Sequence, residues 1–114
     1  PCTTITNIAA CGTPTTATLV GGGSWNTTAC GFSTPGSEKI YSFTPATTGV
    51  YSLQVTSTNS GGFIDYFYKA ASGGCSSSGW TCIDDIFSPG TAPIGTLTAG
   101  TTYYILMDSE QVLP

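Results

Sequence analysis

The sequence predicts an all-β protein: an antiparallel two-sheet sandwich, jelly-roll-like, with about seven strands and disulfide staples. Apolar residues alternate with polar ones in several short segments, and turns rich in Gly and Pro separate these segments. Ser and Thr fill almost a third of the positions. Thr suits strands because its branched Cβ favours extended backbone while its hydroxyl can face water. With 15 glycines and few helix formers, almost no helix is expected.

The clearest alternation lies in residues 39–55. Tyr51, Leu53 and Val55 alternate with polar residues, and a turn containing Pro and Gly precedes them. This pattern predicts an antiparallel hairpin with one buried face. Residues 97–108 repeat the same order, with a Gly turn followed by an aromatic and aliphatic strand. Since a single layer cannot bury such faces, we expect two stacked sheets.

The remaining elements follow in order along the chain. Residues 1–10 form an N-terminal extended segment, and residues 11–114 form a single β-sandwich domain. Residues 15–20 are the first predicted strand, which ends at three consecutive glycines that a strand interior would not tolerate. Further strands are predicted for residues 63–69, 80–86, 93–97 and 101–107.

The charge composition excludes several function classes. Only 7% of residues are charged, the net charge is −4, and the only cations are two Lys. Nucleic acids and anionic membranes attract proteins that supply several cations, so neither is an expected partner. The sequence contains no run of about 18 apolar residues, so no membrane-spanning helix is predicted. Because the chain has no His, Ser–His and Cys–His nucleophiles are unavailable, and we expect no catalytic residue and no enzyme activity.

The acidic residues give the only metal candidates. Asp65, Asp84 and Asp85 offer carboxylate oxygens of the kind that Ca²⁺ accepts. Asp84 and Asp85 are adjacent and therefore point to opposite faces of a strand, which is wrong for a facing catalytic pair. No spaced Asp loop is present, so solvated acids and turn caps are the alternative interpretation. We therefore expect no cofactor.

Five cysteines in a short chain without His indicate a disulfide framework and an oxidising, extracellular setting. Cys75 and Cys82 bracket a Ser/Gly loop and are predicted to pair. Cys11 and Cys30 are predicted to clamp the first strand to the following loop. Cys2 is then left over, either because its partner is missing or because it bridges to another molecule.

Aromatic side chains give a candidate carbohydrate site. The residues that could stack on sugar rings are Trp25, Trp80, Tyr66 and Tyr68. The alternative is structural: Trp80 packs on the disulfide of Cys82, and Trp25 covers one end of the core. Asn26 begins an Asn-Thr-Thr triplet that matches the N-linked glycosylation pattern.

Several motifs occur in an order that resembles a known family. They are the Cys-Gly-Phe run at residues 30–32, the stretches at residues 35–43, 48–51 and 99–105, and the loop at residues 75–82. Together they resemble the bacterial pre-peptidase C-terminal type of β-sandwich module, in the Cys-rich variety found in large secreted and surface proteins. The resemblance covers nearly the whole chain. It implies a non-catalytic domain that accompanies exported proteins, with fibre, glycan or calcium binding in some members.

The resemblance also implies one further strand after the Tyr-Tyr strand, whereas this sequence stops at Pro114. Three interpretations are open: a fragment that lacks the last strand, a slot filled by an extended segment of another copy, or a fold that closes without it. Ile5 and Ile8 are the candidate anchors of a donated N-terminal strand. We therefore expect a building block of a bacterial secreted or surface assembly, joined to copies of itself or to neighbouring modules. The alternative is a carbohydrate-binding module of an exported enzyme, with polysaccharide as its partner.

Overall fold

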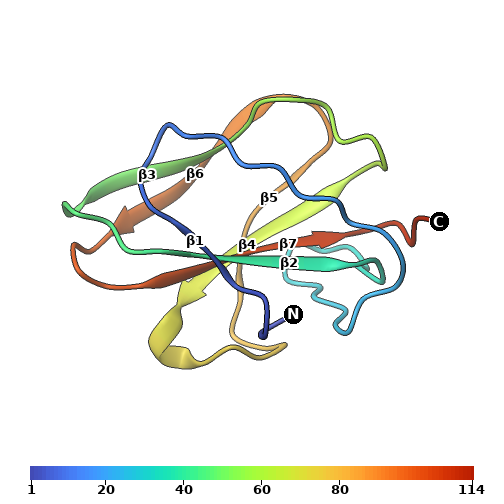
Figure 1. The fold of residues 1–114 in the computed structure, drawn as a ribbon, viewed down its shortest axis with the longest axis horizontal. Coiled ribbons are helices and arrows are strands. Elements are labelled where there is room, and N and C mark those ends of the chain that lie inside the picture. Colours follow the sequence, from blue (N-terminus) through green and yellow to red (C-terminus); the bar gives the residue numbers. More distant parts are fainter.

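The computed structural model describes residues 1–114 and is an all-β protein with two sheets (Figure 1). Five strands form the larger sheet in the order β1-β2-β7-β4-β5, and β3 and β6 form a separate two-stranded sheet. The strands are β1 (Thr6–Ile8), β2 (Glu38–Phe43), β3 (Gly49–Val55), β4 (Ile64–Ala70), β5 (Thr81–Ile86), β6 (Gly90–Leu97) and β7 (Tyr103–Ser109). The one helical element is a 3₁₀ turn at Ala71–Gly73. The predicted all-β class with seven strands in two sheets is confirmed.

The predicted hairpin over residues 39–55 is wrong. Strand β2 pairs with β7, whereas β3 pairs with β6, so the connection between β2 and β3 crosses from one sheet to the other. The connection between β6 and β7 crosses back beside it, and the Gly100 amide donates to the Pro45 carbonyl over 3.0 Å. The order of turn and strand that occurs at residues 39–55 and again at residues 97–108 therefore corresponds to two neighbouring connections between the sheets. Alternation reports which face of a strand is buried but does not report which strand is its neighbour.

The predicted strand at residues 15–20 is also wrong, since this stretch is extended without strand pairing. The N-terminal segment takes a place in the sheet instead. Strand β1 pairs with β2 in parallel, Thr6 opposite Tyr41 and Ile8 opposite Phe43, so the sandwich is not wholly antiparallel. Local β propensity favoured residues 15–20, but a strand also needs an edge with which to pair.

The five-stranded sheet buries both of its faces. One face packs against β3 and β6 through Tyr66, Ile86 and Ala92. The other face carries the cluster of Ile40, Phe67, Trp80 and Leu106, which loops and cystines cover. Only 19 of 114 residues are buried, so the covalent links must supply part of the stability that a larger core would give.

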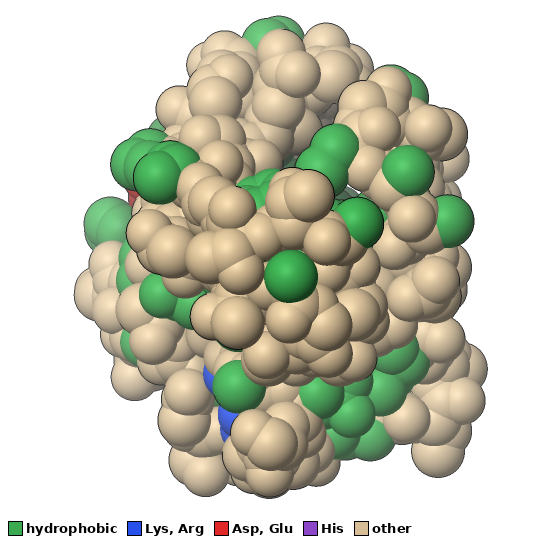
Figure 2. All heavy atoms as spheres, turned by 90° about the vertical axis from the view of Figure 1, so that its left-hand side faces the viewer, with side chains coloured by type: hydrophobic (Ala, Val, Ile, Leu, Met, Phe, Trp, Pro, Cys, Tyr) green, Lys and Arg blue, Asp and Glu red, His purple; other side chains and the backbone are tan.

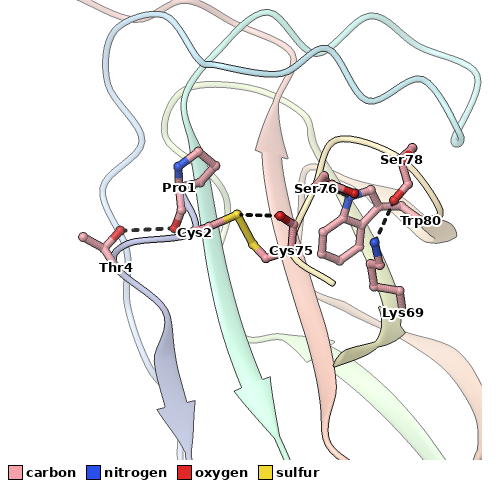
Figure 3. Close-up of a disulfide and its surroundings, with 8 residues drawn as sticks. All are labelled: Pro1, Cys2, Thr4, Lys69, Cys75, Ser76, Ser78 and Trp80. Carbon is pink, nitrogen blue, oxygen red and sulfur yellow. Dashed lines mark hydrogen bonds between the residues drawn. A yellow bond between two sulfur atoms is a disulfide. The ribbon is translucent and has the colours of Figure 1, made fainter. Parts of the chain in front are cut away.

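Both predicted disulfides are wrong. The bonds are Cys2–Cys75 and Cys30–Cys82, and Cys11 is the free, exposed cysteine. Figure 3 shows Cys2 joined to Cys75, which lies in the loop that also carries Trp80. The prediction paired cysteines that are close in sequence, whereas the bonds join the N-terminal segment to the loop of Cys75 and the loop of Cys30 to strand β5. Both bonds lie against the outer face of the large sheet. The presence of disulfides is confirmed and indicates an oxidising environment.

Candidate functional site

Each of the two strands in the small sheet has an outer edge without a partner, and the edge of β3 is the regular one because the bulge lies in β6. Strand β3 has β6 as its only neighbour, and no backbone hydrogen bond joins its other edge to the chain. Along β3 the side chains alternate between half-buried and exposed, and Val50 is 78% exposed. Seven residues with one free edge therefore present a row of unpaired N–H and C=O groups.

A cleft of about 610 Å³ opens beside this edge between the two sheets. Tyr41, Ile105 and Met107 line it from the large sheet, and Leu53 and Leu97 line it from the small sheet. Figure 2 views the end of the sandwich and shows hydrophobic side chains around a hollow on that face. The inner faces of the two sheets are thus incompletely closed against each other.

Residues 13–20, called here the strap, also line this cleft. No hydrogen bond, from backbone or side chain, joins the strap to any other segment. Leu19 is its one buried side chain, and Val20 next to it is 53% exposed. In Figure 1 this blue segment crosses in front of the space between the sheets. The strap therefore covers the cleft through packing contacts, without hydrogen bonds to other segments.

The candidate donor anchors Ile5 and Ile8 are engaged within their own chain. Ile5 packs against the outer cluster, and Ile8 belongs to β1. The bond of Cys2 to Cys75 fixes the start of this segment. Residues 1–10 are therefore not available as a donated strand, which corrects that expectation.

The four candidate sugar-stacking residues do not meet. Trp25 and Trp80 lie on the outer face with ring centroids 6.2 Å apart, whereas Tyr66 lies in the inner cluster and Tyr68 shares its side of β4. Trp80 is 8% exposed and Tyr66 4%. Lys69 Nζ sits 5.1 Å from the Trp80 ring centroid. The central sheet separates the two pairs, so they form no common platform.

Trp80 instead has a structural role, as the alternative interpretation expected. Its indole N–H donates to the Ser76 carbonyl over 2.8 Å, and Lys69 Nζ donates to the Ser78 carbonyl over 2.8 Å (Figure 3). The indole packs in the outer cluster with Cys75 and Cys82 at its edge. These contacts hold the loop of residues 74–80 against the sheet.

Asn26 lies on an exposed loop, and its Oδ1 accepts the Thr34 amide over 2.7 Å. No intramolecular hydrogen bond uses its Nδ2, the atom to which N-linked sugar attaches. Glycosylation at Asn26 remains a prediction.

Two of the three calcium candidates come together with an acid that the sequence analysis missed. Asp65, Asp85 and Glu110 place carboxylate oxygens within 4.8 Å of one another, whereas Asp84 is exposed on the other side of β5. Glu110 follows β7, and its amide donates to the Phe63 carbonyl over 3.2 Å, which holds it beside β4. Nothing in its sequence neighbourhood signals this, because the contact depends on how β7 and β4 are aligned.

Burial changes the protonation of these acids. Asp65 is fully buried, and desolvation, aided by the neighbouring Glu110 and Asp85 carboxyls, raises its pKa to about 9. Desolvation also raises the pKa of Asp85, and it raises the pKa of Asp108 to about 7 against the lowering effect of a hydrogen bond from Thr34. These carboxyls therefore hold protons at a pH where exposed acids are ionised.

No helix in the structure is long and apolar enough to cross a membrane. Comparison of the chain with protein-family models, with curated proteins and with solved structures found no match.

Proposed function

We propose that this protein is a non-catalytic extracellular module, a building block of a bacterial secreted or surface assembly, and that copies associate through the free edge of β3. The observation that carries the proposal is this unpaired edge beside an apolar cleft, whose cover, the strap, is held by no hydrogen bond. Strand addition to an exposed edge gives affinity through main-chain hydrogen bonds and specificity through alternate side chains. The two disulfides and the resemblance to pre-peptidase C-terminal modules support the extracellular setting.

Among the edges of the two sheets, β3 has the least protection against pairing. Its sequence contains no charged residue and no Pro. By contrast, β6 contains Pro93 and the bulge beside it, β5 carries two Asp, and β1 has three residues. Charges, prolines, bulges and short length are the means by which proteins keep edge strands apart.

The occupant that fits this edge is β3 of a second copy. Two such strands in antiparallel pairing would give a four-stranded sheet in the order β6-β3-β3-β6 with two-fold symmetry. Val50 and Gln54 project from the exposed face of β3, so they would meet their counterparts across the new pairing. The same contact would cover one side of the cleft. Association of this kind leaves the pairing of β1 with β2 and the Cys2–Cys75 disulfide unchanged.

Charging this face of β3 is expected to abolish association. In the variant Val50→Lys with Gln54→Lys, antiparallel pairing would bring like charges together across the edge, and such pairs are destabilising. Light scattering coupled to size-exclusion chromatography, over a series of protein concentrations, measures the result. We expect dimers of the unmodified protein and monomers of the variant at every concentration.

The matched control places the same two charges on the cross-strand partners in β6, Thr91→Lys with Thr96→Lys. These residues share the exposed face but lie one strand away from the proposed contact, so dimers should persist. An unmodified protein that stays monomeric at its highest soluble concentration would refute the proposal. Equal loss of association in both variants would assign the effect to net charge and would refute the β3 contact.

A further inference from the structure

Five of the six acids gather at one end of the large sheet. Strand alignment places Glu38 opposite Asp108, Asp108 opposite Asp65, and Asp65 opposite Asp85. Residues directly opposite one another on neighbouring strands project from the same face, so these four form a transverse row across β2, β7, β4 and β5. Glu110 joins the row beside Asp65 and Asp85. Like charges at this spacing repel one another unless protons or a cation intervene.

The two ends of the row are compensated differently. Glu38 accepts the amides of Ser24 and Trp25 over 3.0 and 2.9 Å. Asp108 accepts the Thr34 hydroxyl over 2.9 Å. These donors satisfy the carboxylates on β2 and, in part, on β7.

At the centre of the row the only protons that could be donated are those on the acids themselves. Asp65 is 0% exposed, and neither of its carboxylate oxygens has a hydrogen-bond partner. One oxygen each of Asp85 and Glu110 is likewise buried without a partner. The two Lys are committed elsewhere: Lys39 Nζ donates to the Thr4 carbonyl, and Lys69 Nζ to the Ser78 carbonyl. Buried carboxylates that lack both donors and cations are costly, and binding of a metal ion removes that cost.

We propose that Asp65, Asp85 and Glu110 form a Ca²⁺ site that joins β4, β5 and the segment after β7. Their oxygens lie within 4.8 Å of one another. Ca²⁺ binds oxygen at about 2.3–2.6 Å, so oxygens on opposite sides of one ion are about 5 Å apart. Mg²⁺ binds at about 2.0–2.1 Å in rigid octahedra and usually keeps several waters, so a site with three protein carboxylates suits it less well than Ca²⁺.

The donor set also selects against softer metals. All three ligands are carboxylates, whereas Zn²⁺ and Cu²⁺ favour imidazole and thiolate, and the nearby Cys30 and Cys82 are already joined to each other. Asp85 and Glu110 are only half-buried, which leaves a path from solvent and room for water ligands. Three carboxylates with a partly open path suit the weaker extracellular class of Ca²⁺ site, with Kd on the order of 0.1–1 mM.

Calcium titration of the metal-free protein tests the site. With about 5 mM Ca²⁺ at neutral pH the Tm should rise by about 5–10 °C, and a chelator should reverse the rise. Calorimetric titration should give one ion per chain. Mg²⁺ at the same concentration should give a smaller rise. No Ca²⁺-dependent change in Tm and no calorimetric binding would overturn the proposal, as would an equal or larger rise with Mg²⁺.

Two variants separate the site from general charge effects. In Asp65→Asn the calcium-dependent rise should be lost, while the metal-free variant should melt no lower than the unmodified protein because a buried acid has been neutralised. Glu110→Gln, at a half-buried position, should weaken Ca²⁺ binding at least tenfold. The control Asp84→Asn removes an exposed acid on the other side of β5 and should keep the full rise. A rise that survives in Asp65→Asn would overturn the assignment.

Discussion

Replacing Cys30 and Cys82 with Ser is expected to lower the free energy of unfolding by about 4 kcal/mol. The bond closes a loop with a sequence separation of 52, and the entropy that a crosslink removes from the unfolded chain grows with loop length. Loss of Cys2–Cys75, with a separation of 73, should cost a similar amount. Urea unfolding of the two double variants measures these values. Because folded domains are only marginally stable and this core is small, loss of either bond should leave a free energy of unfolding close to zero.

The free cysteine supplies the control. Cys11 is exposed and unbonded, so Cys11→Ser should change the free energy of unfolding by no more than about 0.5 kcal/mol. Peptide mapping without reduction should recover the fragments of Cys2 with Cys75 and of Cys30 with Cys82. Recovery of Cys11 bonded to Cys30, or a large loss of stability in Cys11→Ser, would contradict the observed pairing.

In metal-free solution the protein should become less stable as the pH rises between about pH 5 and about pH 8, and Asp65 alone should account for a loss on the order of 4 kcal/mol. Asp65 has a pKa of about 9 in the folded protein and about 3.8 when unfolded, and the pKa of Asp108 is raised in the same direction to about 7. Between these limits the folded state binds more protons than the unfolded state. The stabilisation is therefore complete below about pH 4 and is lost as the pH rises through the folded-state pKa values.

Urea unfolding at a series of pH values, in the presence of a chelator, measures this dependence. The groups that face Asp65 are all acids: Asp85 from β5, Asp108 from β7, and Glu110 after β7. Asp65→Asn should therefore remove more than half of the slope, and Asp84→Asn should leave it unchanged. Stability that is level or rises between pH 5 and pH 8 would show that Asp65 is not a buried acid.

The strands were predictable because their signals are local. Alternation and Gly or Pro turns placed β4, β5 and β7 within a few residues of their observed bounds. The pairing of strands was not predictable in this way. A hairpin and a crossing between sheets show the same alternation, and only the partner strand tells them apart. For the same reason the prediction of a strand at residues 15–20 was wrong: the stretch is β-prone, but it pairs with no other strand.

The candidate site was partly predictable. Asp65 and Asp85 were named from their chemistry, whereas Glu110 enters only through the alignment of β7 with β4. The disulfides failed for a related reason. Their short separation in sequence suggested a bond between Cys75 and Cys82. In the structure Cys75 is bonded to Cys2, and Cys82 is bonded to Cys30. Long-range contacts of this kind follow from the fold and not from neighbouring residues.

The two disulfides also determine how the protein would respond to mechanical force applied at its ends. Cys2 is bonded to Cys75, so tension entering at the N-terminus bypasses the residues between them. About 40 residues beyond Cys75 remain extensible, which at about 3.4 Å each gives about 140 Å of extended chain. The reduced chain could extend to about 390 Å on the same scale. Single-molecule pulling before and after reduction would show whether β1 and β2 are shielded from load.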